Sequence, residues 1–309
     1  MRVLVTGGAG FIGSHIAEHF NGKAEVCVLD NLRTGHRENI ENFDVEFIEG
    51  SITERSVVRK AVQGVDYIFH LAAMISVPQS MEKPGECVEI NTKGTLNVLE
   101  EAAEAGVRKL CLSSSAANYG DNPTVPKIET MLPEPKSPYA VTKLDGEYYC
   151  RIFHDEGWLN TVSLRYFNVF GPRQDPKSQY AAVIPIFIHR AIHNEPITIY
   201  GDGTQTRDFI FVKDVVAANV HLATNEELTG VYNVAYGRRQ TIQKVAEKII
   251  DLTGSSSKIE YGPVRPGDVK HSEASIDKIL AADFVPSGRF DDGLGQTIEF
   301  FKDRVQEQT

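Results

Sequence analysis

Short apolar runs alternate with stretches of helical periodicity through the first half of the chain. The apolar runs are rich in Val, Ile, Leu and Phe and occupy residues 2–6, 25–30, 45–50, 65–73, 109–115 and 161–168. Between them, residues 11–20, 91–106 and 138–157 repeat apolar positions at the three- and four-residue spacing of a helix. Strands that alternate with helices predict right-handed βαβ crossovers and a parallel sheet covered on both faces. The pattern therefore predicts a doubly wound α/β fold.

The pattern becomes less regular after residue 168. A turn-rich segment is followed by a predicted helix at 183–195, a strand, loop and strand over 197–212, and helices at 212–224, at 241–254 and near the C-terminus. We expect these elements to form a smaller α/β lobe. Because helix 212–224 is suited to packing on the sheet, we expect the lobes to interleave: a first domain of residues 1–167, with about 207–235, and a second lobe of residues 168–309.

Composition narrows the class of protein. With 309 residues, 41% hydrophobic and 24% charged, the chain is typical of a soluble enzyme, and no apolar run approaches the ~20 residues that span a bilayer. A strand-like run begins at Arg2, so we expect no secretion signal and a cytoplasmic location. The net charge of −10, without a basic cluster, argues against nucleic acid as a partner. An anionic ligand would need local cations.

The cysteines and histidines do not suggest a metal centre. The four cysteines are far apart in sequence, none forms a Cys-x-x-Cys pair, and the nine histidines show no His-Glu-x-x-His pattern. We therefore expect neither a metal site nor a disulfide framework.

A glycine-rich stretch, TGGAGFIG at residues 6–13, lies between the first predicted strand and the first predicted helix. Its glycines permit a tight turn, and the free N–H groups of the helix N-terminus can bind a pyrophosphate. Asp30 ends the second predicted strand, near the offset of ~20 residues typical of dinucleotide sites. Its carboxylate would accept hydrogen bonds from the ribose and repel a 2′-phosphate, which favours NAD over NADP. Arg33 could instead accommodate that phosphate, although we interpret it as a solvated loop charge.

Tyr139 and Lys143 are spaced to share one face of a predicted helix, in the stretch SPYAVTK. A phenol with a pKa of ~10 is a poor base at neutral pH, but an ammonium about 4 Å away would favour its ionisation by roughly 4 kcal/mol at a dielectric near 20. Burial would offset part of this effect. With a positive nicotinamide beside it, we expect the pKa of Tyr139 to fall near neutrality. A solvated helix face is the alternative interpretation.

Together these motifs resemble the extended short-chain dehydrogenase/reductase superfamily, and within it the UDP-hexose 4-epimerases. The resemblance runs the whole length of the chain, through TGGAGFIG (6–13), DNLRTG (30–35), HLAA (70–73), SSSAANYG (113–120), SPYAVTK (137–143), RYFNVFGPRQ (165–174), GDGTQTRDFIFVKDV (201–215) and RPGDVKHSEASI (265–276). It implies a Rossmann-type NAD-binding domain and a nucleotide-sugar-binding lobe.

The resemblance implies positions for NAD in this chain. It assigns the pyrophosphate to Gly7, Gly10, Phe11, Ile12 and Gly13, the adenosine ribose to Asp30 and Asn31, adenine to Ser51 and Ile52, and the remaining cleft to Leu71, Ala72, Ala73, Asn91, Tyr139 and Lys143. Ser51 departs from the family, which usually carries an aspartate there.

The resemblance also implies a reaction and a UDP-sugar site. Ser115, at a strand end, would relay the sugar C4 hydroxyl proton to Tyr139 beside Lys143, while Ser113 and Ser114 would be structural. The family-matching substrate positions are Val77, Asn168, Val183, Tyr200, Arg207, Arg265, Asp268 and Ser272. Ser272 stands where epimerases restricted to UDP-glucose and UDP-galactose carry a tyrosine, so we expect UDP-GlcNAc and UDP-GalNAc to fit as well.

Alternatives remain open within and beyond this family. Related dehydratases and decarboxylases carry an acidic residue just after the catalytic hydroxyl, where this chain has Ala116 and Ala117. This difference argues against elimination and favours oxidation and reduction at C4 alone. A UDP-glucuronate epimerase or decarboxylase and a C4 reductase remain alternatives within the family. A non-catalytic NAD-binding regulatory protein is a further alternative, against which the intact Ser115, Tyr139 and Lys143 argue. Because helices 92–105 and 139–156 carry apolar residues on more than one face, as in the dimers of this superfamily, we expect a homodimer.

Overall fold

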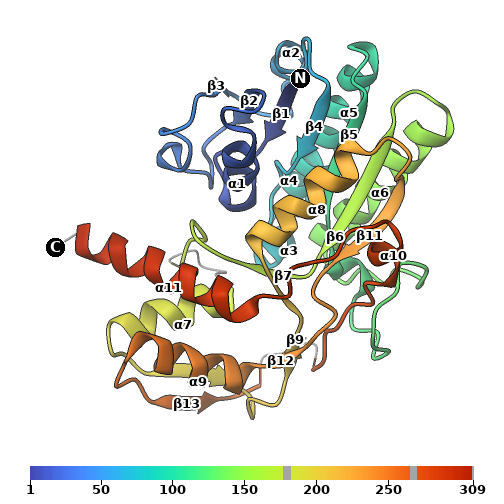
Figure 1. Cartoon of the computed structure of the whole chain (residues 1–309). Helices are drawn as coiled ribbons and strands as arrows, with labels where there is room; N and C mark the ends of the chain where they lie inside the picture. The colour runs from blue at the N-terminus through green and yellow to red at the C-terminus, as the bar shows by residue number, and fades with distance from the viewer. Residues whose placement is uncertain (177–181, 265–269, 308–309) are drawn as a thin grey trace.

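A seven-stranded parallel sheet forms the centre of the computed structural model, which describes residues 1–176, 182–264 and 270–307 (Figure 1). The strand order is β11-β6-β5-β4-β1-β2-β3, and every neighbouring pair is parallel. The strands are β1 (Arg2–Thr6), β2 (Glu25–Asp30), β3 (Glu46–Glu49), β4 (Tyr67–His70), β5 (Lys109–Ser115), β6 (Thr161–Tyr166) and β11 (Gly230–Val234). The chain order reverses between β1 and β4, and ligands of open α/β sheets bind at such a switch point.

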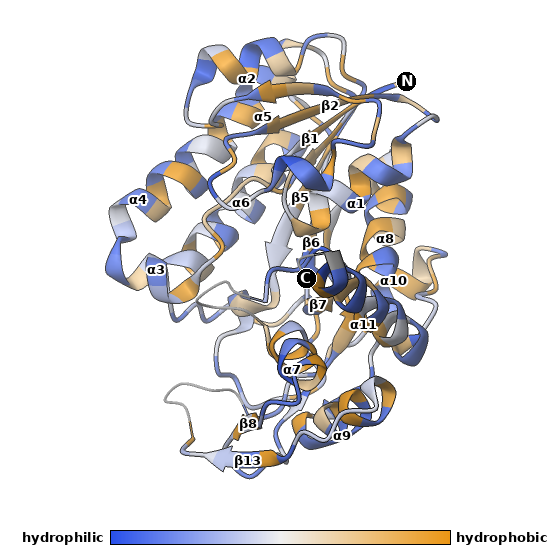
Figure 2. Ribbon diagram, turned by 90° about the vertical axis from the view of Figure 1, so that its left-hand side faces the viewer, coloured by the Kyte–Doolittle hydropathy of each residue, from blue (hydrophilic) through white to orange (hydrophobic). Residues whose placement is uncertain are grey.

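Helices cover both faces of this sheet. On one face α1 (Phe11–Phe20) packs against α8 (Val212–Thr224), and on the other face α5 (Gly94–Glu104) lies between α2 (Arg55–Ala61) and α6 (Pro138–Asp155). The central strands consist mainly of buried apolar residues, as the orange ribbon of β1 and β2 in Figure 2 shows. Parallel strands with helices on both sides need this continuous apolar character, which explains why runs such as RVLVT are unbroken. The predicted fold class is confirmed.

A smaller lobe lies below the carboxyl edge of the sheet in Figure 1. It contains α7 (Val183–Ile192), α9 (Ile242–Thr253) and α11 (Phe290–Glu307), with α10 (Asp277–Ala281) beside β11. Its strands form three pairs: β8 (Ile197–Tyr200) with β13 (Ile259–Gly262), β9 (Thr206–Arg207) with β12 (Gln240–Thr241), and β7 (Asn168–Phe170) with β10 (Phe209–Phe211). The expected division at residue 167 stays a prediction, although α8 and β11 do lie with the sheet.

Several short elements were not predicted from the sequence pattern. They are α3 (Val77–Glu82), α4 (Pro84–Val88), the π-helical turn η2 (Glu89–Lys93), and the 3₁₀ turns η1 (Arg37–Asn39) and η3 (Ala116–Tyr119). Strand β11, which completes the sheet beside β6, was also not predicted. No helix among the described residues is both long and apolar enough to span a membrane.

Candidate functional site

The glycine loop turns tightly between β1 and α1. Gly7 has a φ of +70°, and a Cβ there would lie 2.7 Å from the backbone nitrogen of Ala72. A Cβ on Gly13 would lie 2.2 Å from the carbonyl oxygen of Gly7. Only glycine fits either position. Because Gly10 caps α1 without a side-chain hydrogen bond, the N–H groups of the first turn can bind an anion.

Asp30 ends β2 as a buried carboxylate beside this loop. It accepts hydrogen bonds from the backbone nitrogens of Ala9 (3.0 Å) and Leu32 (2.8 Å). Burial raises the pKa of Asp30, and these backbone hydrogen bonds only partly offset that effect. Nearby Arg33 pairs with Glu86 of α4 at 2.5 Å, so its charge is already compensated. This pairing agrees with a site built for NAD rather than for a 2′-phosphate.

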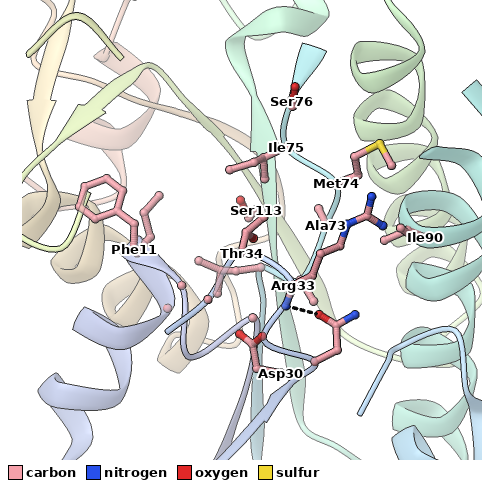
Figure 3. Close-up of a pocket in the computed structure, with 18 of the residues that line it drawn as sticks. Phe11, Asp30, Arg33, Thr34, Ala73, Met74, Ile75, Ser76, Ile90 and Ser113 are labelled. Carbon is pink, nitrogen blue, oxygen red and sulfur yellow. Dashed lines mark hydrogen bonds between the residues drawn. The ribbon is translucent and has the colours of Figure 1, made fainter. Parts of the chain in front are cut away.

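A cavity of about 650 Å³ runs from Asp30 past the glycine loop to the ends of β4 and β5. Figure 3 shows Phe11 on one side of it, with Met74 and Ile90 on the other and Asp30 at one end. Of the residues assigned to NAD, those that line it are Gly7, Gly10, Phe11, Ile12, Gly13, Asp30, Asn31, Ser51, Ile52, Leu71, Ala72, Ala73, Tyr139 and Lys143.

Asn91 does not line this cavity. Its side chain accepts from the nitrogen of Met74 at 2.7 Å and donates to the carbonyl of Met74 and to the hydroxyl of Thr142. It thereby joins η2 to the segment after β4 and to α6. In this structure Asn91 supports the cavity wall from behind.

Ser115, Tyr139 and Lys143 lie together in the cavity wall. Ser115 ends β5, and its hydroxyl oxygen accepts from the nitrogen of Ala117 at 3.1 Å while also contacting the Tyr139 hydroxyl. Tyr139 lies in the first turn of α6, and its backbone nitrogen donates to Ser80. The three residues thus form one polar group at the carboxyl edge of the sheet.

The expected lowering of the Tyr139 pKa by Lys143 is not found within the protein itself. Burial raises the pKa of Tyr139, and the hydrogen bond with Ser115 opposes this only in part. The Lys143 ammonium is bound by the backbone: its Nζ donates to the Ser113 carbonyl at 2.8 Å and lies 5.9 Å from the centre of the Tyr139 ring. Burial also lowers the pKa of Lys143 to about 8, which leaves it mostly protonated at neutral pH.

A buried polar cluster supports the strand end from behind. Glu147 of α6 accepts from the Ser114 hydroxyl at 2.5 Å and from the Asn118 amide at 2.9 Å, and Arg165 donates to both of its oxygens at 2.8 and 2.7 Å. The Ser114 hydroxyl is therefore held by α6, while the backbone carbonyl of Ser113 holds Lys143. Both residues also line the cavity.

Most of the substrate candidates lie in the smaller lobe, away from the lining of this cavity. Ser272 donates its backbone nitrogen to Thr206 at 3.1 Å, which brings it beside Arg207, and the Asn168 amide donates to the Asp208 carbonyl. Tyr200 ends β8, while Val183 and Val77 begin α7 and α3. Arg265 and Asp268 lie outside the described residues. Of the substrate positions, only Ser115 lines the described cavity.

The cavity has lining residues that the sequence did not single out. They include Met74, Ile75 and Ser76 after β4, Tyr166 and Phe167 at the end of β6, and Arg173, Gln174 and Asp175 after β7. Residues 173 and 174 belong to the quoted RYFNVFGPRQ motif, so a signal was present, but nothing in the spacing showed that this loop reaches the glycine loop.

Taken together, these residues fit a dinucleotide. The glycine turn lets the backbone approach closely, α1 offers free N–H groups, a buried carboxylate lies at one end, and a hydroxyl pair lies at the other.

Comparison with known proteins identifies relatives across the whole chain. Residues 3–235 match the model of the NAD dependent epimerase/dehydratase family. The UDP-N-acetylglucosamine 4-epimerase of Methanobrevibacter ruminantium, solved with UDP-N-acetylmuramic acid, is 40% identical with a TM-score of 0.94, covering 98% of both chains. The UDP-glucose 4-epimerase of Thermus thermophilus, solved with NAD, is 39% identical with a TM-score of 0.90, covering 98% of this chain and 99% of the other.

A relative with a different reaction is similarly close. The UDP-N-acetyl-alpha-D-glucosaminuronate decarboxylase of Bacillus cytotoxicus is 35% identical over 98% of this chain and 98% of its own length. Overall similarity therefore does not separate epimerisation from decarboxylation, and the choice depends on the residues of the site.

Proposed function

Because the chain belongs to the NAD dependent epimerase/dehydratase family, whose cofactor it shares, we propose that it is a UDP-hexose 4-epimerase. We propose UDP-glucose and UDP-galactose as one substrate pair and UDP-GlcNAc and UDP-GalNAc as another. The observation that carries this proposal is the grouping of Ser115, Tyr139 and Lys143 in the wall of the cavity that Asp30 closes at its other end.

In the proposed mechanism the chain moves one proton while it holds the sugar. NAD, when bound, supplies the acceptor and donor for the C4 hydride. The Ser115 hydroxyl contacts the C4 oxygen and passes its proton to Tyr139. Because burial keeps the pKa of Tyr139 high, the phenol becomes a base only when further positive charge enters the cavity. Lys143, held at the Ser113 carbonyl, would bind the nicotinamide ribose, and the same proton returns to the sugar after the keto sugar has turned.

Epimerisation is favoured over elimination or decarboxylation by the residues that follow Ser115. Ala116 and Ala117 begin η3, where an elimination would need an acidic side chain. Among the described lining residues the carboxylates are Asp30, at the far end, and Asp175, in the loop after β7. Neither belongs to η3. A UDP-uronate decarboxylase stays as the second candidate because of the Bacillus cytotoxicus relative.

Ser272 supports the wider sugar range. It is half-buried beside Arg207, and its side chain is much smaller than the tyrosine of the restricted epimerases, so we propose that it leaves room for a 2-acetamido group. We expect Ser272→Tyr to lower kcat/KM for UDP-GlcNAc much more than for UDP-glucose. Unchanged ratios would contradict this assignment, and Ser256→Tyr, on an exposed loop, serves as a control.

We also propose a homodimer formed through α6 and α5. On α6 the side chains of Val141, Tyr148 and Ile152 are 43%, 51% and 47% exposed, and their spacing places them on one helix face. An exposed apolar stripe of this kind is typical of an interface. Light scattering should give twice the chain mass for the wild type and a lower mass for Tyr148→Glu.

The function is tested by incubating the purified protein with UDP-galactose, UDP-GalNAc and UDP-glucuronate separately, without added nicotinamide, and identifying the products by NMR. The proposal predicts C4 epimers of the first two without net NADH. Carbon dioxide from the uronate would support the decarboxylase instead, and NAD binding without turnover of any of the three would support a regulatory protein.

A further inference from the structure

Arg173 stands out among the lining residues of the cavity because its backbone is strained. Its φ of +64° lies in the left-handed region, which non-glycine residues rarely adopt. Strain of this kind persists only where neighbouring contacts hold the residue, and it is concentrated at functional sites. Arg173 follows Pro172 in the loop of residues 171–175, which leaves the end of β7 and reaches back to the sheet domain.

The contacts that hold Arg173 come mainly from α1. Its guanidinium donates to the Glu18 carboxylate at 2.6 Å and to the Ser14 hydroxyl at 3.4 Å. The ring of His15 donates from Nε2 to the Pro172 carbonyl at 3.0 Å, so the loop backbone is attached to the same helix. The Arg173 side chain is 16% exposed, and this partial burial makes the ion pair less screened than a surface pair.

Glu18 is well placed to hold this cation. The hydrogen bond from His15, together with the charge of Arg173, lowers the pKa of Glu18 to about 2. The Arg173 guanidinium also lies 5.3 Å from the centre of the Phe43 ring, in the segment before β3. The loop is thus joined to two parts of the sheet domain.

The position of the loop relates these contacts to the cofactor. α1 begins at the glycine loop, and Arg173, Gln174 and Asp175 line the same cavity as Gly10 and Phe11. A Cβ on Gly171 would lie 3.5 Å from the Phe11 ring, so the loop packs on the residue that forms one side of the cavity in Figure 3. The 171–175 loop therefore lies over the pyrophosphate side of the cofactor site.

We propose that Arg173 is a cofactor-retaining residue: by binding Glu18 and Ser14 it keeps the 171–175 loop closed against α1 and slows the release of NAD and NADH. Retention matters for a reaction that removes and returns a hydride without releasing its cofactor. The inference rests on NAD binding and is independent of which sugar is turned over.

The test measures the rate at which NADH leaves the purified protein, without sugar, by the loss of its fluorescence after mixing with excess NAD. Arg173→Asn removes the guanidinium, and asparagine tolerates the left-handed backbone. We expect this variant to release NADH about tenfold faster, because changes in affinity fall mainly on the dissociation rate. Glu18→Ala leaves the arginine without its ion-pair partner, and we expect release about threefold faster. Arg190→Gln and Glu195→Ala, in an exposed ion pair on and after α7, are matched controls that should leave the rate unchanged.

Thermal unfolding of each variant is measured alongside. Wild-type release rates in a folded Arg173→Asn protein would overturn the proposal. Faster release in Arg173→Asn with no change in Glu18→Ala would also overturn it, because Arg173 would then act on the cofactor directly. If Arg173→Asn does not fold, the Glu18→Ala rate decides. Since no sugar is present, a failure of the proposed epimerase activity leaves this result unaffected.

Discussion

Replacing Glu147 by Gln should destabilise the protein strongly, because it leaves a buried guanidinium without its counter-charge. Glu147 and Arg165 are each only 4% exposed at the side chain and are joined by two hydrogen bonds. Burial alone would lower the pKa of Arg165, and the hydrogen bonds and charge of Glu147 more than offset this and raise it. The pair is therefore strongly coupled.

The expected magnitude follows from the burial of the pair. Removing one partner of a buried ion pair costs about 3–5 kcal/mol. At this chain length the unfolding temperature changes by about 2 °C per kcal/mol, so Glu147→Gln should unfold roughly 6–10 °C earlier. Glu195→Gln, which breaks the exposed pair with Arg190, should cost at most about 1 kcal/mol.

A second substitution tests whether the uncompensated charge of Arg165 causes the loss of stability. Adding Arg165→Met to Glu147→Gln removes the uncompensated charge, so the double variant should unfold at a higher temperature than Glu147→Gln alone. Scanning calorimetry on wild type, Glu147→Gln, Arg165→Met and the double variant measures the effect. A single variant within about 2 °C of wild type would refute the reasoning, and so would a double variant less stable than Glu147→Gln.

Three further predictions concern the cofactor loop, acid stability and the base. Gly13→Ala should abolish NAD binding in calorimetric titration, because its Cβ would lie 2.2 Å from the Gly7 carbonyl oxygen, whereas Gly295→Ala, with open space around it, should bind normally. Burial, and to a smaller extent the charge of Lys143, lowers the pKa of His70 to about 3 in the folded protein. On acidification His70 therefore gains a proton in the unfolded state before it does so in the folded state. The stability that this residue contributes is complete above about pH 6.5 and is lost as the pH falls toward 3. Urea unfolding of His70→Gln should therefore show a shallower loss of stability on acidification than wild type. Tyr139→Phe should lower kcat about 10²- to 10⁴-fold while NAD titration shows unchanged binding; near-wild-type turnover would exclude the phenol as the base.

The sequence predicted those features that depend on local pattern. Unbroken apolar runs between amphipathic helices are enough to predict a parallel sheet, and glycines between a strand and a helix are enough to predict the cofactor loop. Strand β11 escaped prediction because it begins at a glycine and lies outside the regular alternation of the first half of the chain. Its place beside β6 depends on contacts with residues about seventy positions earlier. Local periodicity carries no information about such pairings.

Side-chain direction was the other missing information. The spacing of Tyr139 and Lys143 correctly indicated one helix face, but it did not show that the ammonium would bind the Ser113 carbonyl rather than approach the phenol. In the same way, the motif that contains Arg173 did not reveal its contact with Glu18, which lies 155 positions earlier in the chain. Both depend on how separate segments meet at the edge of the sheet.

The fate of a deuterium at C4 tests the central claim most directly. UDP-galactose carrying deuterium at C4 is incubated with the purified protein, and the product is examined by NMR. The account predicts UDP-glucose that retains the deuterium at C4, because the hydride leaves and returns to the same carbon without leaving the protein. Deuterium that has moved to C6, as an elimination requires, or that is lost to solvent or to free NADH would contradict it.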